Sequence, residues 1–207
     1  HKNSVTFVQR SDENTKRDFP FDYELKIKYT INGDTVTNEY IVTNTGEDKL
    51  PFVIGGHPAF NCPLAKNEKF EDYKVVFDKK ITKPCLRPDH HTGLVNVFEK
   101  FDEMHGGDTL SLVHELFEEK DALIFENCEA KSATLIGKSG KGVKIEFQDM
   151  NNLLIWSAVG SAPFVALEPW TGLASCNDED GLFEHKRGMT VLEKDETASF
   201  KFKITMI

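Results

Sequence analysis

Hydrophobic and polar residues alternate along much of the chain, as in β-strands that bury one face. The clearest case is residues 23–31, Tyr-Glu-Leu-Lys-Ile-Lys-Tyr-Thr-Ile, where the two kinds of side chain strictly alternate. Asn32-Gly33-Asp34 then supplies a tight-turn signal, and residues 35–44 alternate again. These two segments therefore predict a β-hairpin.

Short runs of the same kind recur at close spacing. They predict further strands at residues 5–9, 49–54, 73–77, 110–113, 122–125, 132–136, 143–147, 153–157, 164–167, 189–192 and 198–205. Helical periodicity is nearly absent, and residues 112–120 are expected to form at most one or two turns. The segments expected to be loops are 58–71, 83–107 and 171–187. This pattern predicts an all-β fold, a large antiparallel β-sandwich in a single domain over residues 1–207.

Composition and charge narrow the class of partner. The chain has 207 residues, which suits one all-β domain, and its 16 phenylalanines suit packing on pleated sheets. The formal net charge is -9, with both signs spread along the chain, so nucleic acid and anionic membrane surfaces are repelled. We expect no nucleic-acid partner, no membrane association and no signal peptide; the oligomeric state is left open.

The four cysteines, Cys62, Cys85, Cys128 and Cys176, form no CxxC pair. This spacing argues against a structural zinc site, and four cysteines in a chain of this length do not make a disulfide scaffold. We expect them to be reduced and the protein to be cytoplasmic, with no metal and no cofactor.

The first segment with chemical potential is Gly55-Gly-His-Pro-Ala-Phe-Asn-Cys-Pro63. It follows a predicted strand, and its two glycines allow unusual backbone angles or a close approach. His57 would stand at the end of that strand, and an imidazole can give or take a proton near neutral pH. The alternative is a structural turn with a hydrogen-bonded histidine.

The second segment is Ala162-Pro-Phe-Val-Ala-Leu-Glu-Pro-Trp-Thr-Gly172, an apolar strand that leads into Glu168. A carboxylate at the end of a buried strand is costly unless it has partners, and an aromatic ring beside it suits a sugar face. We expect Pro169 to end the strand and to direct the carboxylate. The alternative is a glutamate that only reaches solvent. Asp121 precedes a predicted strand and could reach the same pocket; the alternative is a surface acid.

Together these two segments resemble the galactose mutarotase-like, or aldose 1-epimerase, family, and most closely its LacX-like subgroup. Weaker matching pieces follow the family's order across nearly the whole chain: Phe19-Pro-Phe-Asp-Tyr-Glu-Leu, Asp121-Ala-Leu-Ile-Phe-Glu and Lys186-Arg-Gly-Met-Thr-Val-Leu-Glu. The resemblance implies the mutarotase supersandwich, with His57 as general acid, Glu168 as general base and Asp121 as a substrate-binding residue. The other expected substrate-binding residues are Trp170 and Phe60, as an apolar platform, and Asn61.

The chain departs from the pattern of this family in one respect. The family has a His-Gly-x-x-Arg type segment before the point where this chain begins, and its Arg and His line the sugar site. We therefore expect the N-terminal portion of the family domain to be absent here.

The expected reaction is the interconversion of the α and β anomers of a hexose, catalysed by an isomerase with a sugar as its small-molecule substrate. A non-catalytic sugar-binding or sensing domain remains an alternative, although it would not need both an acid and a base. A hexose 6-phosphate 1-epimerase is another, for which Arg87, Lys186 and Arg187 are candidate phosphate ligands. A structural β protein with a decayed site is the third.

Overall fold

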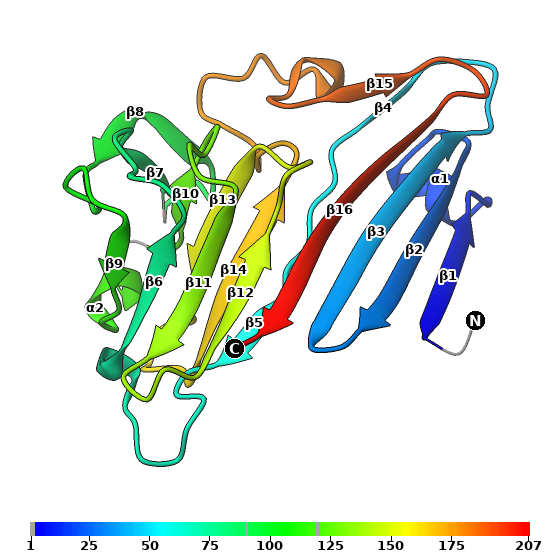
Figure 1. The fold of residues 1–207 in the computed structure, drawn as a ribbon. Helices are drawn as coiled ribbons and strands as arrows, with labels where there is room; N and C mark the ends of the chain where they lie inside the picture. The colour runs from blue at the N-terminus through cyan, green and yellow to red at the C-terminus, as the bar shows by residue number, and fades with distance from the viewer. Residues whose placement is uncertain (1–2, 90, 119–120) are drawn as a thin grey trace.

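The computed structural model describes residues 3–89, 91–118 and 121–207. Antiparallel sheets dominate it, as the alternating pattern predicts (Figure 1). An eight-stranded sheet has the order β1-β2-β3-β16-β12-β11-β6-β9. Its strands are β1 (Ser4–Arg10), β2 (Tyr23–Asn32), β3 (Thr35–Asn44), β16 (Thr197–Met206), β12 (Gly142–Glu146), β11 (Ser132–Gly137), β6 (Tyr73–Phe77) and β9 (Thr109–Ser111).

A six-stranded sheet with the order β5-β14-β13-β10-β7-β8 packs on one half of the first sheet (Figure 1). Its strands are β5 (Ala59–Asn61), β14 (Phe164–Trp170), β13 (Asn152–Trp156), β10 (Leu123–Phe125), β7 (Cys85–Pro88) and β8 (Val95–Phe101). A short ribbon of β4 (Leu50–Phe52) and β15 (Thr190–Leu192) lies over the other half. Helix is limited to α1 (Thr15–Asp18), α2 (Glu115–Glu118) and the 3-10 turns Phe70–Asp72 and Phe183–His185.

The predicted hairpin is confirmed as β2 and β3. Their register runs from Tyr23 opposite Asn44 to Asn32 opposite Thr35. Gly33 closes the turn with φ +58°, a left-handed conformation that favours glycine because it has no Cβ.

The main core lies between the two large sheets and follows from the alternation of the strands. On β14, Val165 and Leu167 point into this core, and on β13 Leu153 and Ile155 do the same. Ala166 and Glu168, which alternate with these residues on β14, consequently point to the opposite face of the six-stranded sheet, because side chains alternate along a strand. A smaller cluster of Val42, Leu50, Phe52 and Leu192 fixes the β4–β15 ribbon and so the start of the loop that leads to His57. We expect each fully buried apolar side chain to contribute about 1.5–3 kcal/mol.

Three strands fall in segments that the sequence assigns to loops. β5 lies within residues 58–71, and β7 and β8 lie within residues 83–107. These strands are short, and β7 ends at Pro88, so they carry little periodic signal; they form because distant strands offer edges to pair with. The expected helical turns at 112–120 reduce to α2, while residues 119 and 120 lie outside the described residues.

Candidate active site

Glu168 lies on β14, opposite Leu154 of β13, on the face of the six-stranded sheet that points away from the main core. Its side chain is only 3% exposed. Burial, and secondly the negative charge of Asp121, raise its pKa from 4.5 to about 7. A carboxylate with a pKa near neutrality is suited to general acid–base chemistry at neutral pH.

The prediction that Pro169 ends the strand is wrong, because β14 continues through Pro169 to Trp170. Pro169 is opposite Leu153 on β13, and its carbonyl accepts a hydrogen bond from Gly56 N on the other side. In a strand, the N–H and the C=O of one residue lie on the same side, so the side of Pro169 that lacks an N–H faces the loop of Gly55 and Gly56. The hydrogen bonds between β14 and β13 are therefore unaffected by the proline. Glu168 is thus directed by the alternation of an unbroken strand.

His57 reaches Glu168 from the loop between β4 and β5. Its Nε2 lies 3.3 Å from Glu168 Oε1, and its side chain is 58% exposed. One edge of the imidazole therefore lies toward the buried carboxyl group, and the rest of the ring faces solvent.

The two glycines before His57 allow the loop to lie close to the sheets. A Cβ on Gly55 would stand 2.4 Å from Trp170 Cδ1, and a Cβ on Gly56 would stand 2.5 Å from Phe202 Cε1. Both distances are shorter than real contacts, so any larger residue would push the loop outward and move His57. The glycine signal in the sequence thus reflects a close backbone approach.

Asp121 lies near the same carboxylate, at the start of the segment that leads into β10. Its backbone is left-handed, with φ +55°, and its N–H is bonded to Phe117 O at 3.1 Å. Its Oδ1 accepts a hydrogen bond from Trp156 Nε1. The negative charge of Asp121 is, after burial, the second cause of the raised Glu168 pKa.

Sequence reasoning missed Trp156, although it placed the residue in a strand. Trp156 is opposite Ala166 of β14, and its ring meets the His57 ring edge-on with centroids 5.7 Å apart. The signal that would have found it is the register of β13 on β14, which a single sequence does not reveal.

The expected substrate platform is only partly assembled. Trp170 lies on the same face as Glu168, and its Nε1 donates to Gly56 O at 3.1 Å. Phe60 is opposite Val165, so it points toward the main core and packs there, away from Glu168. Asn61 is exposed and pairs opposite Phe164. Phe164 precedes Glu168 by four residues on β14, which at the rise of a strand is a distance of roughly 13 Å.

A cavity of about 500 Å³ adjoins His57. The wall consists of Val53, Ile54, Gly55, Gly56, His57, Trp170, Gly172, Leu173, Ala174, Ser175 and Lys186. A second cavity of about 320 Å³ is lined by apolar residues of β2, β3, β4 and the segments beside them, Phe19 and Phe183 included, and neither His57 nor Glu168 lines it. The larger cavity includes His57 in its wall, and Glu168 lies behind this wall. The larger cavity, with its tryptophan wall and few polar groups, is the one that suits a small polar ligand.

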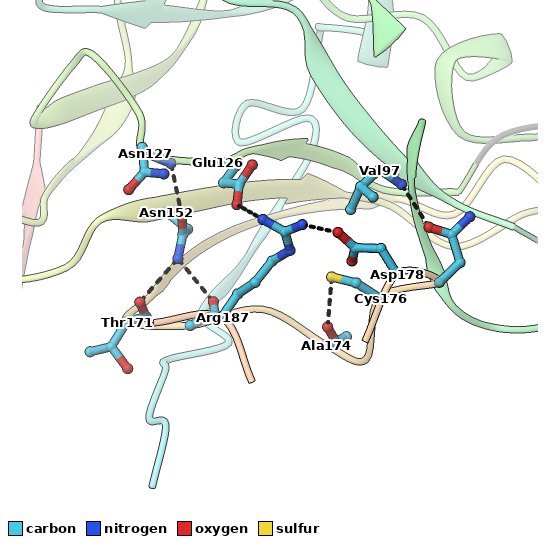
Figure 2. Close-up of polar contacts among 11 residues, drawn as sticks. Val97, Glu126, Asn127, Asn152, Thr171, Ala174, Cys176, Asp178 and Arg187 are labelled. Carbon is cyan, nitrogen blue, oxygen red and sulfur yellow. Dashed lines mark hydrogen bonds and ion pairs between the residues drawn. The ribbon is translucent and has the colours of Figure 1, made fainter. Parts of the chain in front are cut away.

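The three candidate phosphate ligands, Arg87, Lys186 and Arg187, are all paired with carboxylates. Arg87 is buried on the core side, where it donates to Leu116 O and Glu103 Oε1, both at 2.8 Å. Lys186 Nζ donates to Ser175 Oγ at 3.0 Å and lies 3.3 Å from Glu179 Oε2. Figure 2 shows the Arg187 guanidinium between Glu126 and Asp178.

The loop after β14, which forms one wall of the larger cavity, is anchored to the sheet by buried polar contacts (Figure 2). Asn152 Nδ2 donates to the carbonyls of Trp170, Thr171 and Gly172 at 3.0–3.3 Å, and its Oδ1 accepts from Asn127 N at 2.9 Å. The Arg187 pairs add a second anchor. The position of this wall is therefore fixed by contacts with the six-stranded sheet.

All four cysteines are free and buried, and burial raises the pKa of the Cys62 thiol to about 12. Within the described residues, no group of three or more His, Cys, Asp or Glu side chains is placed to hold a metal ion. In the same part of the chain, no helix has the length and apolar character needed to cross a membrane.

Comparison with known proteins shows the family of the chain. The family model described as aldose 1-epimerase matches residues 1–205. The chain belongs to the aldose 1-epimerase family. Among curated relatives in this family, the plasmid and chromosomal LacX proteins of Lactococcus lactis subsp. lactis are each 34% identical over 209 residues, which cover 100% of this chain and 70% of theirs.

Solved structures of the family superpose closely on this one. A galactose mutarotase related enzyme from Lactobacillus acidophilus has a TM-score of 0.91 at 26% identity, over 100% of this chain and 69% of that chain. A galactose mutarotase-like protein from Lactobacillus casei has a TM-score of 0.88 at 28% identity, over 100% of this chain and 71% of that chain. The aldose 1-epimerase family member described here therefore has the galactose mutarotase-like fold that its two motif segments imply.

Proposed function

We propose that the protein is an aldose 1-epimerase that interconverts the α and β anomers of a hexose. The observation that carries the proposal is the contact of His57 Nε2 with Glu168 Oε1 at 3.3 Å, made by a buried carboxyl group whose pKa is about 7. A group poised in this way changes protonation state at neutral pH, and it stands beside a second group suited to proton transfer.

In the proposed mechanism Glu168, as the carboxylate, removes the proton from the C1 hydroxyl of the cyclic sugar. His57, as the imidazolium, gives a proton to the ring oxygen as the bond between that oxygen and C1 breaks. The open-chain aldehyde rotates about the C1–C2 bond. The hydroxyl that was formed from the ring oxygen then adds to the other face of C1; it returns its proton to His57, and Glu168 returns its proton to the oxygen on C1. Protons and electrons balance over the cycle, so each residue returns to its starting state.

The charges near the cavity favour a neutral sugar over a hexose 6-phosphate. Lys186 is paired with Glu179, and Arg187 is shared by Glu126 and Asp178. A phosphate would have to displace a carboxylate from one of these cations, while Asp121 and Glu168 would repel it. The 6-phosphate alternative is thus the weaker one.

The presence of both an acid and a base separates the proposed enzyme from a non-catalytic sugar-binding domain. Such a domain needs hydrogen-bond partners and an aromatic wall, but it does not need a carboxyl group with a pKa near 7 beside an imidazole.

The test is exchange NMR or polarimetry on freshly dissolved α-glucose, α-galactose and α-glucose 6-phosphate. Wild type is compared with Glu168→Gln and with Glu193→Gln, a matched change at an exposed glutamate paired with Lys49. We expect accelerated anomer exchange that Glu168→Gln loses by about 10²–10⁴-fold and Glu193→Gln keeps. Sugar binding without acceleration would support the binding domain, and acceleration of the phosphate alone would support the 6-phosphate enzyme.

A further inference from the structure

One side chain, Trp156, contacts two of the three ionisable groups at the site. Its Nε1 donates to Asp121 Oδ1, and its ring meets the His57 ring at an interplanar angle of 86°. We propose that Trp156 is a positioning residue of the epimerase site, which holds the Asp121 carboxylate against Glu168 and supports the His57 ring. The inference rests on the proposed function for its catalytic consequence, but the contacts themselves can be tested without turnover.

Trp156 is itself held in place from behind. It is the last residue of β13, and its ring packs on Phe164 of β14 with centroids 5.4 Å apart. The next residue, Ser157, donates its hydroxyl to Phe164 O at 2.8 Å, which ties the end of β13 to the start of β14. The indole is therefore fixed by strand pairing and packing before it contacts either ionisable group.

Asp121, in contrast, depends on local contacts for its direction. It follows α2 and has a left-handed backbone, a conformation that few residues other than glycine adopt readily. Its carboxylate accepts the Trp156 hydrogen bond, and a hydrogen bond to a charged group is stronger than one between neutral groups. Loss of the indole N–H would free this carboxylate to turn toward solvent and away from Glu168.

The consequence for catalysis is a change in pH dependence. Two titratable groups act on Glu168: the His57 imidazole, from the loop after β4, lies 3.3 Å away, and the Asp121 carboxyl group, from the segment before β10, acts through its charge. Asp121 is one of the causes of the raised Glu168 pKa, after burial. If Trp156 holds Asp121 in place, its removal lowers the pH at which Glu168 becomes a carboxylate.

The kinetic test compares Trp156→Phe, Asp121→Asn and the double variant. Phenylalanine keeps a ring against His57 and Phe164 but has no N–H to donate. We expect Trp156→Phe to move the acid limb of the kcat/KM profile to lower pH, as Asp121→Asn does, and to lower kcat/KM by about 10- to 100-fold. The double variant should show no further shift, because both changes remove the same interaction.

An independent test uses the two tryptophans of the chain as probes. Their indole N–H groups donate to different acceptors, Trp156 to Asp121 and Trp170 to Gly56 O, so they give separate NMR signals that Trp156→Phe assigns. We expect Asp121→Asn to move the Trp156 indole proton upfield and to leave the Trp170 signal in place.

The outcomes separate the inference from the proposed function. An unmoved Trp156 indole signal, or additive pH shifts in the double variant, would overturn the positioning role. If the wild-type protein does not accelerate anomer exchange, the proposed function is wrong. The indole signals would in that case still decide whether Trp156 holds Asp121.

Discussion

Replacing Glu168 with glutamine should stabilise the protein at neutral pH while it abolishes activity. The pKa of Glu168 is 4.5 in ordinary surroundings and about 7 in the folded protein, because burial and the Asp121 charge disfavour the carboxylate. Between these two pH values the folded state binds more protons than the unfolded state, so the free energy of unfolding falls as pH rises. At 1.36 kcal/mol per pKa unit, the ionised group destabilises the fold by about 3 kcal/mol above pH 7. Glutamine has nearly the same shape and does not ionise.

Denaturant unfolding of wild type and Glu168→Gln between pH 4.5 and pH 8 measures this difference. We expect similar stability near pH 4.5, and a gain for the variant that grows to about 3 kcal/mol at pH 8, or on the order of 5–10 °C in Tm. A gain that is the same at both ends of the range, or absent at pH 8, would refute the assignment of a raised pKa to Glu168.

Glu68→Gln is a control in which the change in stability at high pH should have the opposite sign. Glu68 is also buried, but hydrogen bonds from Tyr73 Oη and from Ser139 lower its pKa. Its carboxylate therefore contributes stability above its unfolded pKa, and that contribution is lost as pH falls. We expect Glu68→Gln to be less stable than wild type at pH 8, with the difference shrinking toward low pH.

Two further substitutions test the construction of the site, and a labelling experiment tests the core. Gly55→Ala should displace the loop, because its Cβ would overlap the Trp170 ring; we expect a loss of about 1–3 kcal/mol and of most activity, and wild-type kinetics would contradict the close approach. Asn152→Leu should lower the free energy of unfolding by about 2–4 kcal/mol in a denaturant titration, because three carbonyls and one N–H lose their partner; a loss below about 0.5 kcal/mol would argue against this anchor. Cys62, with a pKa of about 12, should react with a thiol reagent at pH 8 only on unfolding, and rapid labelling of the native protein would contradict its burial.

The sequence by itself was sufficient for the fold class, and it singled out the two segments whose side chains, His57 and Glu168, meet in the structure. Strict alternation over β2 and β3 with Asn32-Gly33 between them specifies a hairpin, because side-chain period and turn chemistry are local properties. The glycines before His57 and the apolar run before Glu168 are equally local, and their resemblance to the aldose 1-epimerase family agrees with the family match and the fold.

What the tertiary structure decided is which residues meet. Phe60 belongs to the segment around His57 that the sequence singles out, but pairing opposite Val165 points it into the core. Trp156 carried no signal, since its role arises from the register of β13 on β14 and from a contact with Asp121, 35 residues away. Arg87, a candidate phosphate ligand in the sequence, lies buried against Glu103. Local patterns fix which face of a strand is apolar, but the partner of each side chain depends on contacts between distant segments, which only the folded chain brings together.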